Sequence, residues 1–182
     1  MHKSPTALAA LTVPLLALTA CVTAEPTGGP PMALVNSAGQ SVGTVRAWQT
    51  AGGAAFRIEA TGLPHGVHGI HVHSVGRCEG RGFESAGPHW NPGARKHGTA
   101  NPAGPHAGDI PNVIVAANGT LNETVTLSGA NMLGAGAAGV LLDADGASIV
   151  LHAAADDYAT DPSGNSGARI ACAVLQPNPE LR

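Results

Sequence analysis

The chain has 182 residues, a net charge of −3 with neutral histidines, 12% charged residues and 3% aromatic residues. The length allows one domain with a substantial core plus appended segments, and the weakly negative charge argues against a partner such as nucleic acid. Glycine occurs 25 times and proline 14 times, which favours short strands and many turns over long helices.

Residues 1–20 are predicted to be a signal peptide. One lysine precedes an apolar run from about Ala7 to Ala20, which is too short to span a bilayer and is typical of a secretory signal. The run ends in Leu-Thr-Ala-Cys, which resembles a bacterial lipobox and implies lipidation of Cys21 and anchoring to the outer face of a bacterial membrane. A plain secretory signal or a buried strand is the alternative. Residues 21–31, rich in proline and glycine, are expected to be a flexible tether.

Residues 32–182 are predicted to form one domain of short β-strands separated by turns. Phe56, Ile58 and Ala60 alternate with charged residues, as expected for a half-buried strand. The pattern predicts an all-β fold of about eight strands, an antiparallel barrel or sandwich. Hairpins are expected over 32–48, 112–127 (turning at Asn118-Gly119) and 139–152 (turning at Asp145-Gly146), and single strands over 54–63, 68–73 and 168–175.

Two stretches, 74–111 and 153–168, do not have the pattern of strands. Long irregular segments inside a compact domain usually carry function. The first contains three histidines and an aspartate, and a loop so rich in glycine could be ordered by metal ligation instead of hydrophobic burial. His89, His97, His106 and Asp109 supply three nitrogens and one oxygen, a set suited to zinc.

A second set of histidines lies on predicted strands. His71 and His73 point to the same side of a strand, roughly 6–7 Å apart along it. One His-x-His alone is a weak signal, but His152 closes another predicted strand. Together with His89 these residues would supply four nitrogens, and tetragonal nitrogen ligation suits Cu(II).

The order and spacing of these motifs resemble those of the copper/zinc superoxide dismutases. The chain carries Gly-Ile-His-Val-His, Gly-Pro-His-Trp-Asn-Pro, Lys-His-Gly, His-x-Gly-Asp, Leu-His-x-x-x-Asp-Asp and Gly-Asn-Ser-Gly-Ala-Arg-Ile-Ala-Cys in that order. The resemblance covers about residues 33–175 and implies an eight-stranded antiparallel Greek-key β-barrel, an immunoglobulin-like sandwich with two long functional loops.

The resemblance also implies the site. It assigns one copper per subunit to His71, His73, His89 and His152, and one zinc per subunit to His89, His97, His106 and Asp109. His89 would bridge the two ions, because two nearby dications allow an imidazole to lose its second proton. Asp156 would link a copper histidine to a zinc histidine, with Asp157 as the alternative. Cys78 and Cys172 would form a disulfide.

The activity that the resemblance implies is conversion of two superoxide anions and two protons to O₂ and H₂O₂ by Cu(II)/Cu(I) cycling, with zinc structural. His89 would deliver a proton, and Arg169 would hold the superoxide anion beside copper. The expected role is defence against extracytoplasmic superoxide, and a homodimer is possible. One departure is that residues 158–163 contain no lysine, so steering of the anion would be weaker or would come from elsewhere.

We expect that the remaining histidines do not bind a metal. His2 lies in the signal, His65 in an exposed turn, and His68 is expected to be structural, because it lies three residues before His71 and so faces the other way. Three other functions compete: a non-catalytic extracytoplasmic copper/zinc-binding protein, a copper-only enzyme, and a structural lipoprotein that inherited the barrel.

Overall fold

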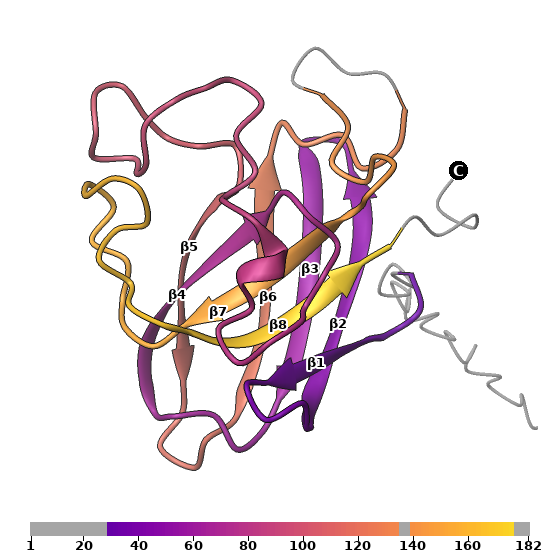
Figure 1. Cartoon of the computed structure of the whole chain (residues 1–182), viewed down its shortest axis with the longest axis vertical. Helices are drawn as coiled ribbons and strands as arrows, with labels where there is room; N and C mark the ends of the chain where they lie inside the picture. Colours follow the sequence, from indigo (N-terminus) through magenta and orange to yellow (C-terminus); the bar gives the residue numbers. More distant parts are fainter. Residues whose placement is uncertain (1–28, 135–138, 177–182) are drawn as a thin grey trace, which may run out of the picture.

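The computed structural model describes residues 29–134 and 139–176, which form eight antiparallel strands (Figure 1). The predicted signal peptide, Cys21 and most of the tether lie outside the described residues. The sheet order is β5-β4-β7-β8-β1-β2-β3-β6. The turn that joins β5 to β6 brings the two ends of the sheet together into a nearly closed barrel, without a ladder between these two strands. This confirms the predicted all-β Greek-key fold. The strands are β1 (Met32–Asn36), β2 (Ser41–Thr50), β3 (Gly53–Ala60), β4 (Gly66–His73), β5 (Asp109–Val115), β6 (Leu121–Ser128), β7 (Ala147–His152) and β8 (Arg169–Leu175).

Two sequence expectations differ from the structure. Residues 139–146 form no strand; Leu141 and Leu142 are buried without a ladder, and Asp145-Gly146 makes a turn that leads into β7. A short apolar run near a turn looks the same whether it packs as a strand or as a buried loop, because burial alone sets its composition. The expected loop over 74–111 is also shorter, since β5 begins at Asp109.

The barrel core is filled by the alternate residues of each strand. Phe56 and Ile58 of β3, Leu127 of β6 and Leu151 of β7 are almost completely buried, whereas Glu59 is exposed. Every residue of β7 is buried, although only one of its faces points into the barrel. The other face carries Val150, which packs with Phe83, Ala86 and Cys172 in a small separate cluster, so the long loop (residues 74–108) covers it.

This arrangement places the histidine side chains outside the barrel core. Ile70 and Val72 of β4 belong to the main core, so His71 and His73 lie on the opposite, outer face of the same strand. In the ladder His71 pairs with Val150 and with Asp109 on either side. The long loop and the second loop (residues 153–168) lie over this outer face; in Figure 1 the long loop crosses the centre of the view and continues at the upper left, and the second loop lies at the left.

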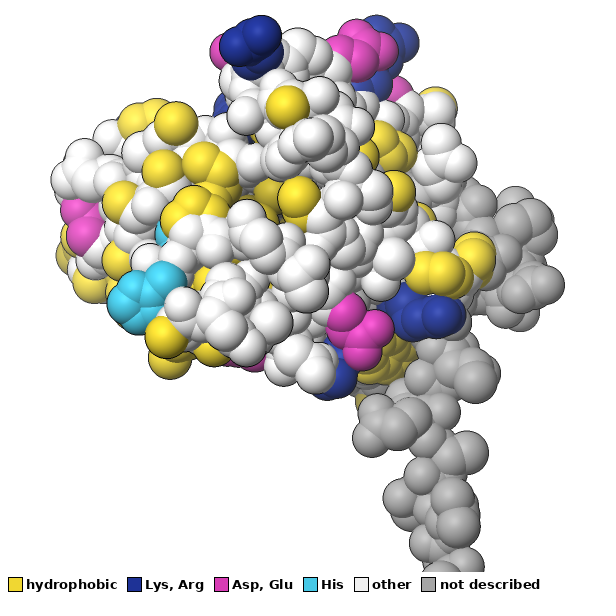
Figure 2. Space-filling model, turned by 90° about the horizontal axis from the view of Figure 1, so that it is seen from below, with side chains coloured by type: hydrophobic (Ala, Val, Ile, Leu, Met, Phe, Trp, Pro, Cys, Tyr) yellow, Lys and Arg dark blue, Asp and Glu magenta, His cyan; other side chains and the backbone are white. Residues whose placement is uncertain are grey.

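The opposite end of the molecule, seen in Figure 2, has hydrophobic side chains gathered on one side. Val67 of β4 and Ile114 of β5 are a cross-strand pair and are 47% and 64% exposed. Among the described residues, no helix is long and apolar enough to cross a membrane.

Candidate metal centre

Four buried histidine nitrogens face one another on the outer side of β4 and β7. They belong to a histidine pair on β4, one histidine of the long loop and one at the end of β7. Their ligand atoms lie within 4.8 Å of one another. Each nitrogen is buried and has no hydrogen-bond partner in the described part of the chain; they are His71 Nδ1, His73 Nε2, His89 Nε2 and His152 Nε2.

Unpaired buried nitrogens are costly unless something binds them, since water is excluded and each group loses its hydration. Four converging imidazole nitrogens are the donor set that Cu(II) prefers. The other ring nitrogen of three of these histidines is held by the protein: His71 Nε2 by Asp156 at 2.8 Å, His73 Nδ1 by Gly87 O at 2.8 Å and His152 Nδ1 by Gly167 O at 3.2 Å. The residues present therefore fit copper, with fixed ring orientations.

A second cluster gathers around one oxygen of Asp109. Its Oδ1 lies 3.0 Å from Nδ1 of His89, 3.0 Å from Nδ1 of His97 and 3.3 Å from Nδ1 of His106. His106 Nδ1 is also 3.4 Å from His89 Nδ1. Three nitrogens and one carboxylate oxygen this close together are a fit for zinc. The ligand atoms that all lie within 4.8 Å of one another belong to His71, His89, His97 and Asp109, and His106 joins this group through Asp109 and His89. His71 also lies near this group because its ring stacks on His89, with centroids 4.0 Å apart, but its Nε2 is used by Asp156.

His89 is the residue that both clusters share. Its Nδ1 faces Asp109 on the zinc side, and its Nε2 is one of the four unpaired nitrogens on the copper side. His89 lies where the long loop pairs with the end of β4, and it forms an isolated β-bridge with His73. The geometry is that of one imidazole placed between two cation sites.

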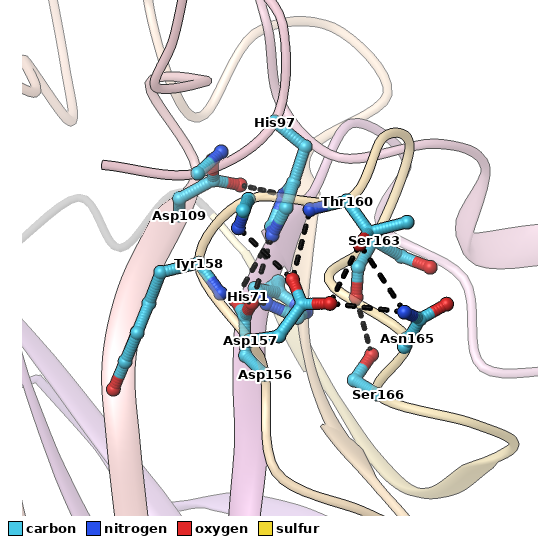
Figure 3. Close-up of polar contacts among 12 residues, drawn as sticks. His71, His97, Asp109, Asp156, Asp157, Tyr158, Thr160, Ser163, Asn165 and Ser166 are labelled. Carbon is cyan, nitrogen blue, oxygen red and sulfur yellow. Dashed lines mark hydrogen bonds and ion pairs between the residues drawn. The ribbon is translucent and has the colours of Figure 1, made fainter. Parts of the chain in front are cut away.

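Asp156 contacts one histidine of each cluster. Its Oδ2 lies 2.8 Å from His71 Nε2, and both of its oxygens lie 3.0 Å from His97 Nε2 (Figure 3). Asp157 instead accepts hydrogen bonds from Thr160 and Asn165, on the other side of the second loop. The structure thus places Asp156, and not the alternative Asp157, against the two histidines. Gly164 is required here, because a Cβ on it would meet Asp156 Oδ1 and lie 2.8 Å from His97 Nε2.

Arg169 stands at the wall of a cavity of about 920 Å³ that His73, His89 and His152 also line. Its guanidinium donates hydrogen bonds to Phe83 O at 2.7 Å and Gly87 O at 2.9 Å. Burial lowers the pKa of this guanidinium, but arginine stays charged at any physiological pH. The open side of the four-nitrogen cluster is therefore an anion-attracting cavity.

The disulfide Cys78–Cys172 is present, as predicted. It joins the long loop to β8, three residues beyond Arg169. His65 is exposed and His68 is buried, as predicted; the two ring nitrogens of His68 lie 2.8 Å from His152 O and 2.8 Å from Pro64 O.

Three polar residues near the centre were missed by the sequence reasoning. Lys96 lines the cavity mouth beside Asp161, and both Asn112 and Tyr158 hydrogen-bond around Asp156. The lysine is the first residue of the Lys-His-Gly motif, but its partner Asp161 is 65 residues away in the sequence. Tyr158 is the only tyrosine in the chain, which was a signal that went unused.

Burial makes the metal-free centre sensitive to acid. It lowers the pKa of His73 to about 2 and those of His89 and His152 to about 4, while an unfolded histidine titrates near about 6.5. At a pH between the folded and unfolded pKa values, the unfolded chain binds more protons than the folded protein does. The free energy of unfolding therefore decreases as the pH falls below about 6.5. The pKa of Asp109 also lies well below its usual range: burial would raise it, but N–H donors from His89 and His97 outweigh that effect.

The pKa of His97 is shifted upward, in the opposite direction to those of the three other histidines. Burial would lower its pKa, but hydrogen bonds to Asp109 and Asp156 raise it to about 9, so its contribution is complete below about pH 6.5 and is lost as the pH rises toward 9. We expect the melting temperature of metal-free protein to peak near about pH 6.5 and to fall on both sides. Scanning calorimetry between pH 4 and 9 measures this; a melting temperature that rises steadily above pH 7 would contradict the assignment to His97.

Comparisons with known proteins agree with this geometry. Residues 41–175 match the family model described as copper/zinc superoxide dismutase (SODC). Superoxide dismutase [Cu-Zn] 1 of Aquifex aeolicus is 39% identical over 149 residues, covering 79% of this chain and 85% of that protein. Superoxide dismutase [Cu-Zn] of Caulobacter vibrioides is 40% identical over 139 residues, covering 76% and 80%. The crystal structure of a SOD-like protein from Bacillus subtilis superposes with a TM-score of 0.77 at 39% identity, covering 81% of this chain and 99% of that one. The chain therefore belongs to the copper/zinc superoxide dismutase family.

Proposed function

We propose that the chain dismutates superoxide at a copper ion held by His71, His73, His89 and His152, beside a zinc ion held by His89, His97, His106 and Asp109. The observation that carries the assignment is the set of four unpaired buried nitrogens beside a cavity lined by Arg169. Family membership supports copper, zinc and superoxide as cofactors and substrate. A protein that only stored metal would not need an arginine fixed at the open face of the copper set.

The residues divide the work as follows. Copper held by these residues would supply a one-electron redox couple, through which one superoxide is oxidised to O₂ and the next is reduced, with two protons, to H₂O₂. Arg169 holds the anion through its fixed fork of N–H donors, and two backbone carbonyls keep that fork in place. His89 lines the cavity with Nε2 on the copper side and would carry a proton to the reduced superoxide. Asp109 and the zinc histidines keep His89 oriented through Nδ1.

The test is superoxide decay by pulse radiolysis of the chain from Thr23 onward, loaded with copper and zinc. Decay that is fast at catalytic protein concentration and recurs over many pulses supports the proposal. Decay no faster than that in buffer, with both metals bound, overturns it and leaves a metal-binding barrel.

Steering of the anion has a candidate source in the long loop. The second loop offers no lysine near the cavity, but Lys96 lines the cavity mouth, where its Nζ lies 2.9 Å from Asp161 Oδ2. Asp161 also accepts the backbone N–H of His97 at 2.9 Å, so it holds the lysine-bearing segment against the second loop. A cation at the mouth raises the local concentration of an anionic substrate, although its carboxylate neighbour offsets part of that field.

Lys96→Gln should lower the second-order rate constant for superoxide by about twofold to threefold at low salt, with a smaller effect at high salt, because exposed charges are screened. Pulse radiolysis at several ionic strengths measures both. Arg57→Gln on β3 is the matched control: it makes the same change in net charge, on a residue that does not line the cavity. Equal effects of the two substitutions would show that net charge, and not Lys96, governs the approach.

We also propose a location for the protein in the cell. Lipidation of Cys21 would hold the domain on the outer face of a bacterial membrane through the tether of residues 21–31, and two or more acyl chains give stable anchoring. Expression of the full chain and of Cys21→Ala in a bacterium tests this: the first should sediment with membranes and the second should not. A homodimer remains a prediction that sedimentation equilibrium can measure.

A further inference from the structure

A β-bulge interrupts the ladder between β4 and β5. His68 pairs with Val113 and Ile70 pairs with Ile110, so one residue of β4, Gly69, faces two residues of β5, Pro111 and Asn112. Proline has no N–H to give to a ladder, and the N–H of Asn112 lies within the irregular part of the pairing. The bulge therefore leaves backbone donors of both strands available to another part of the chain.

The second loop docks on this bulge. Gly69 N–H donates to Ala154 O at 2.8 Å. The side chain of Asn112 holds both backbone groups of Asp156: its Nδ2 donates to Asp156 O at 2.9 Å, and its Oδ1 accepts Asp156 N–H at 2.8 Å. A Cβ on Gly69 would lie 2.9 Å from Ser166 Cβ and 3.3 Å from Asp156 Cβ, so only glycine allows this close approach.

Tyr158, two residues after Asp156, also attaches the second loop to the bulge. Its hydroxyl accepts the N–H of Asn112 at 2.8 Å, and its own N–H donates to Asp156 Oδ1 at 2.6 Å. Its carbonyl accepts the N–H of Ala100 in the long loop at 2.9 Å. Tyr158 has a φ of 61°, a left-handed conformation that a residue with a bulky side chain adopts only when its surroundings fix it. Figure 3 shows its ring lying along β5, away from the carboxylate of Asp156.

We propose that Asn112 and Tyr158 are positioning residues that clamp the backbone of Asp156 and so aim its carboxylate at His71 and His97. The inference rests on the proposed metal centre. Asp156 contacts His71, which belongs only to the copper set, and His97, which belongs only to the zinc set. Both of its side-chain oxygens are committed to those rings and to Tyr158 N–H. A small rotation of its backbone would turn the carboxylate away from both rings, and the clamp prevents that rotation.

A second hydrogen-bond group in the same loop provides the control. Thr160 Oγ1 donates to Asp157 Oδ2 at 2.6 Å and accepts from Asn165 Nδ2 at 3.2 Å. These contacts close the tip of the second loop, but they do not reach Asn112 or the carboxylate of Asp156. Thr160→Val therefore removes side-chain hydrogen bonds from the same loop without touching the clamp.

The experiment compares zinc release from the copper- and zinc-loaded wild-type chain, Tyr158→Phe and Thr160→Val into an excess of a chromogenic chelator. Changes in groups that orient metal ligands typically cost 10–100-fold in affinity, so Tyr158→Phe should release zinc about tenfold faster than wild type. Thr160→Val should stay within about twofold of wild type. Asn112→Ala, which removes both contacts to the Asp156 backbone, should release zinc at least as fast as Tyr158→Phe.

The outcomes separate the clamp from the centre itself. A wild-type chain that binds no zinc overturns the proposed metal centre and the clamp with it. Normal zinc binding with unchanged release from Tyr158→Phe, or with equal acceleration by Thr160→Val, overturns the clamp alone. The Cu(II) electron paramagnetic resonance spectrum gives a readout independent of turnover: Tyr158→Phe should shift it, because the orientation of His71 changes, and Thr160→Val should not.

Discussion

Replacing His152 with alanine should abolish dismutation while zinc binding persists. His152 is 3% exposed at the end of β7 and supplies one of the four unpaired nitrogens. It is not a member of the zinc set, although its ring centroid lies 6.2 Å from that of the shared His89. Loss of groups that only orient a ligand costs 10–100-fold, so loss of a ligand itself should lower the rate constant by more than about 100-fold. Metal analysis and pulse radiolysis on the same sample measure both effects.

The matched control is His65→Ala, which removes an imidazole from an exposed turn of the same protein. It should keep both metals and full turnover. Substantial turnover by the His152 variant would remove this residue from the copper set. Loss of zinc along with copper would show that the two sites depend on each other more strongly than their separate contacts indicate.

Reducing the disulfide should produce the largest loss of stability. Cys78 and Cys172 are 94 residues apart, and in the chain-entropy model a loop of that length contributes about 4–5 kcal/mol to the free energy of unfolding. Urea unfolding of the metal-free protein, with and without a phosphine reductant, measures the difference. The double variant Cys78→Ala/Cys172→Ala should be insensitive to the reductant. A loss below about 1 kcal/mol in the wild type would mean that the reduced unfolded chain retains structure that the model omits.

Reduction should also impair the metal-loaded enzyme. The disulfide anchors the long loop to β8, and that loop supplies the Phe83 and Gly87 carbonyls that hold Arg169. Gly87 O also accepts from His73 Nδ1, so one carbonyl serves both the arginine and a copper histidine. Freeing this segment therefore loosens the anion site together with one ring of the copper set.

The largest gaps in the sequence reasoning were residues whose role depends on distant partners. Lys96 lies in the Lys-His-Gly motif but the motif assigned it no role, and Asn112 and Tyr158 lie in no motif. The contacts that reveal their roles join residues 65, 44 and 46 positions apart. The choice of Asp156 over Asp157 rested on the family resemblance alone, because adjacent aspartates have the same chemistry and only the backbone direction of the second loop separates them. The strand expected at 139–144 failed because apolar runs record burial, and buried loops share them with strands.

The family resemblance implied the pairing of the cysteines. The sequence by itself determined most of the strand pattern, the two long loops and the two groups of candidate ligands. These follow from local rules: side chains alternate along a strand, turns need particular residues, and metals select donor atoms by chemistry. The tertiary structure decided that the histidines of β4 lie on the outer face, that His89 stands between the two clusters, and that a bulge receives the second loop beneath Asp156. Those outcomes depend on strand register and on contacts between distant segments, which no local pattern encodes.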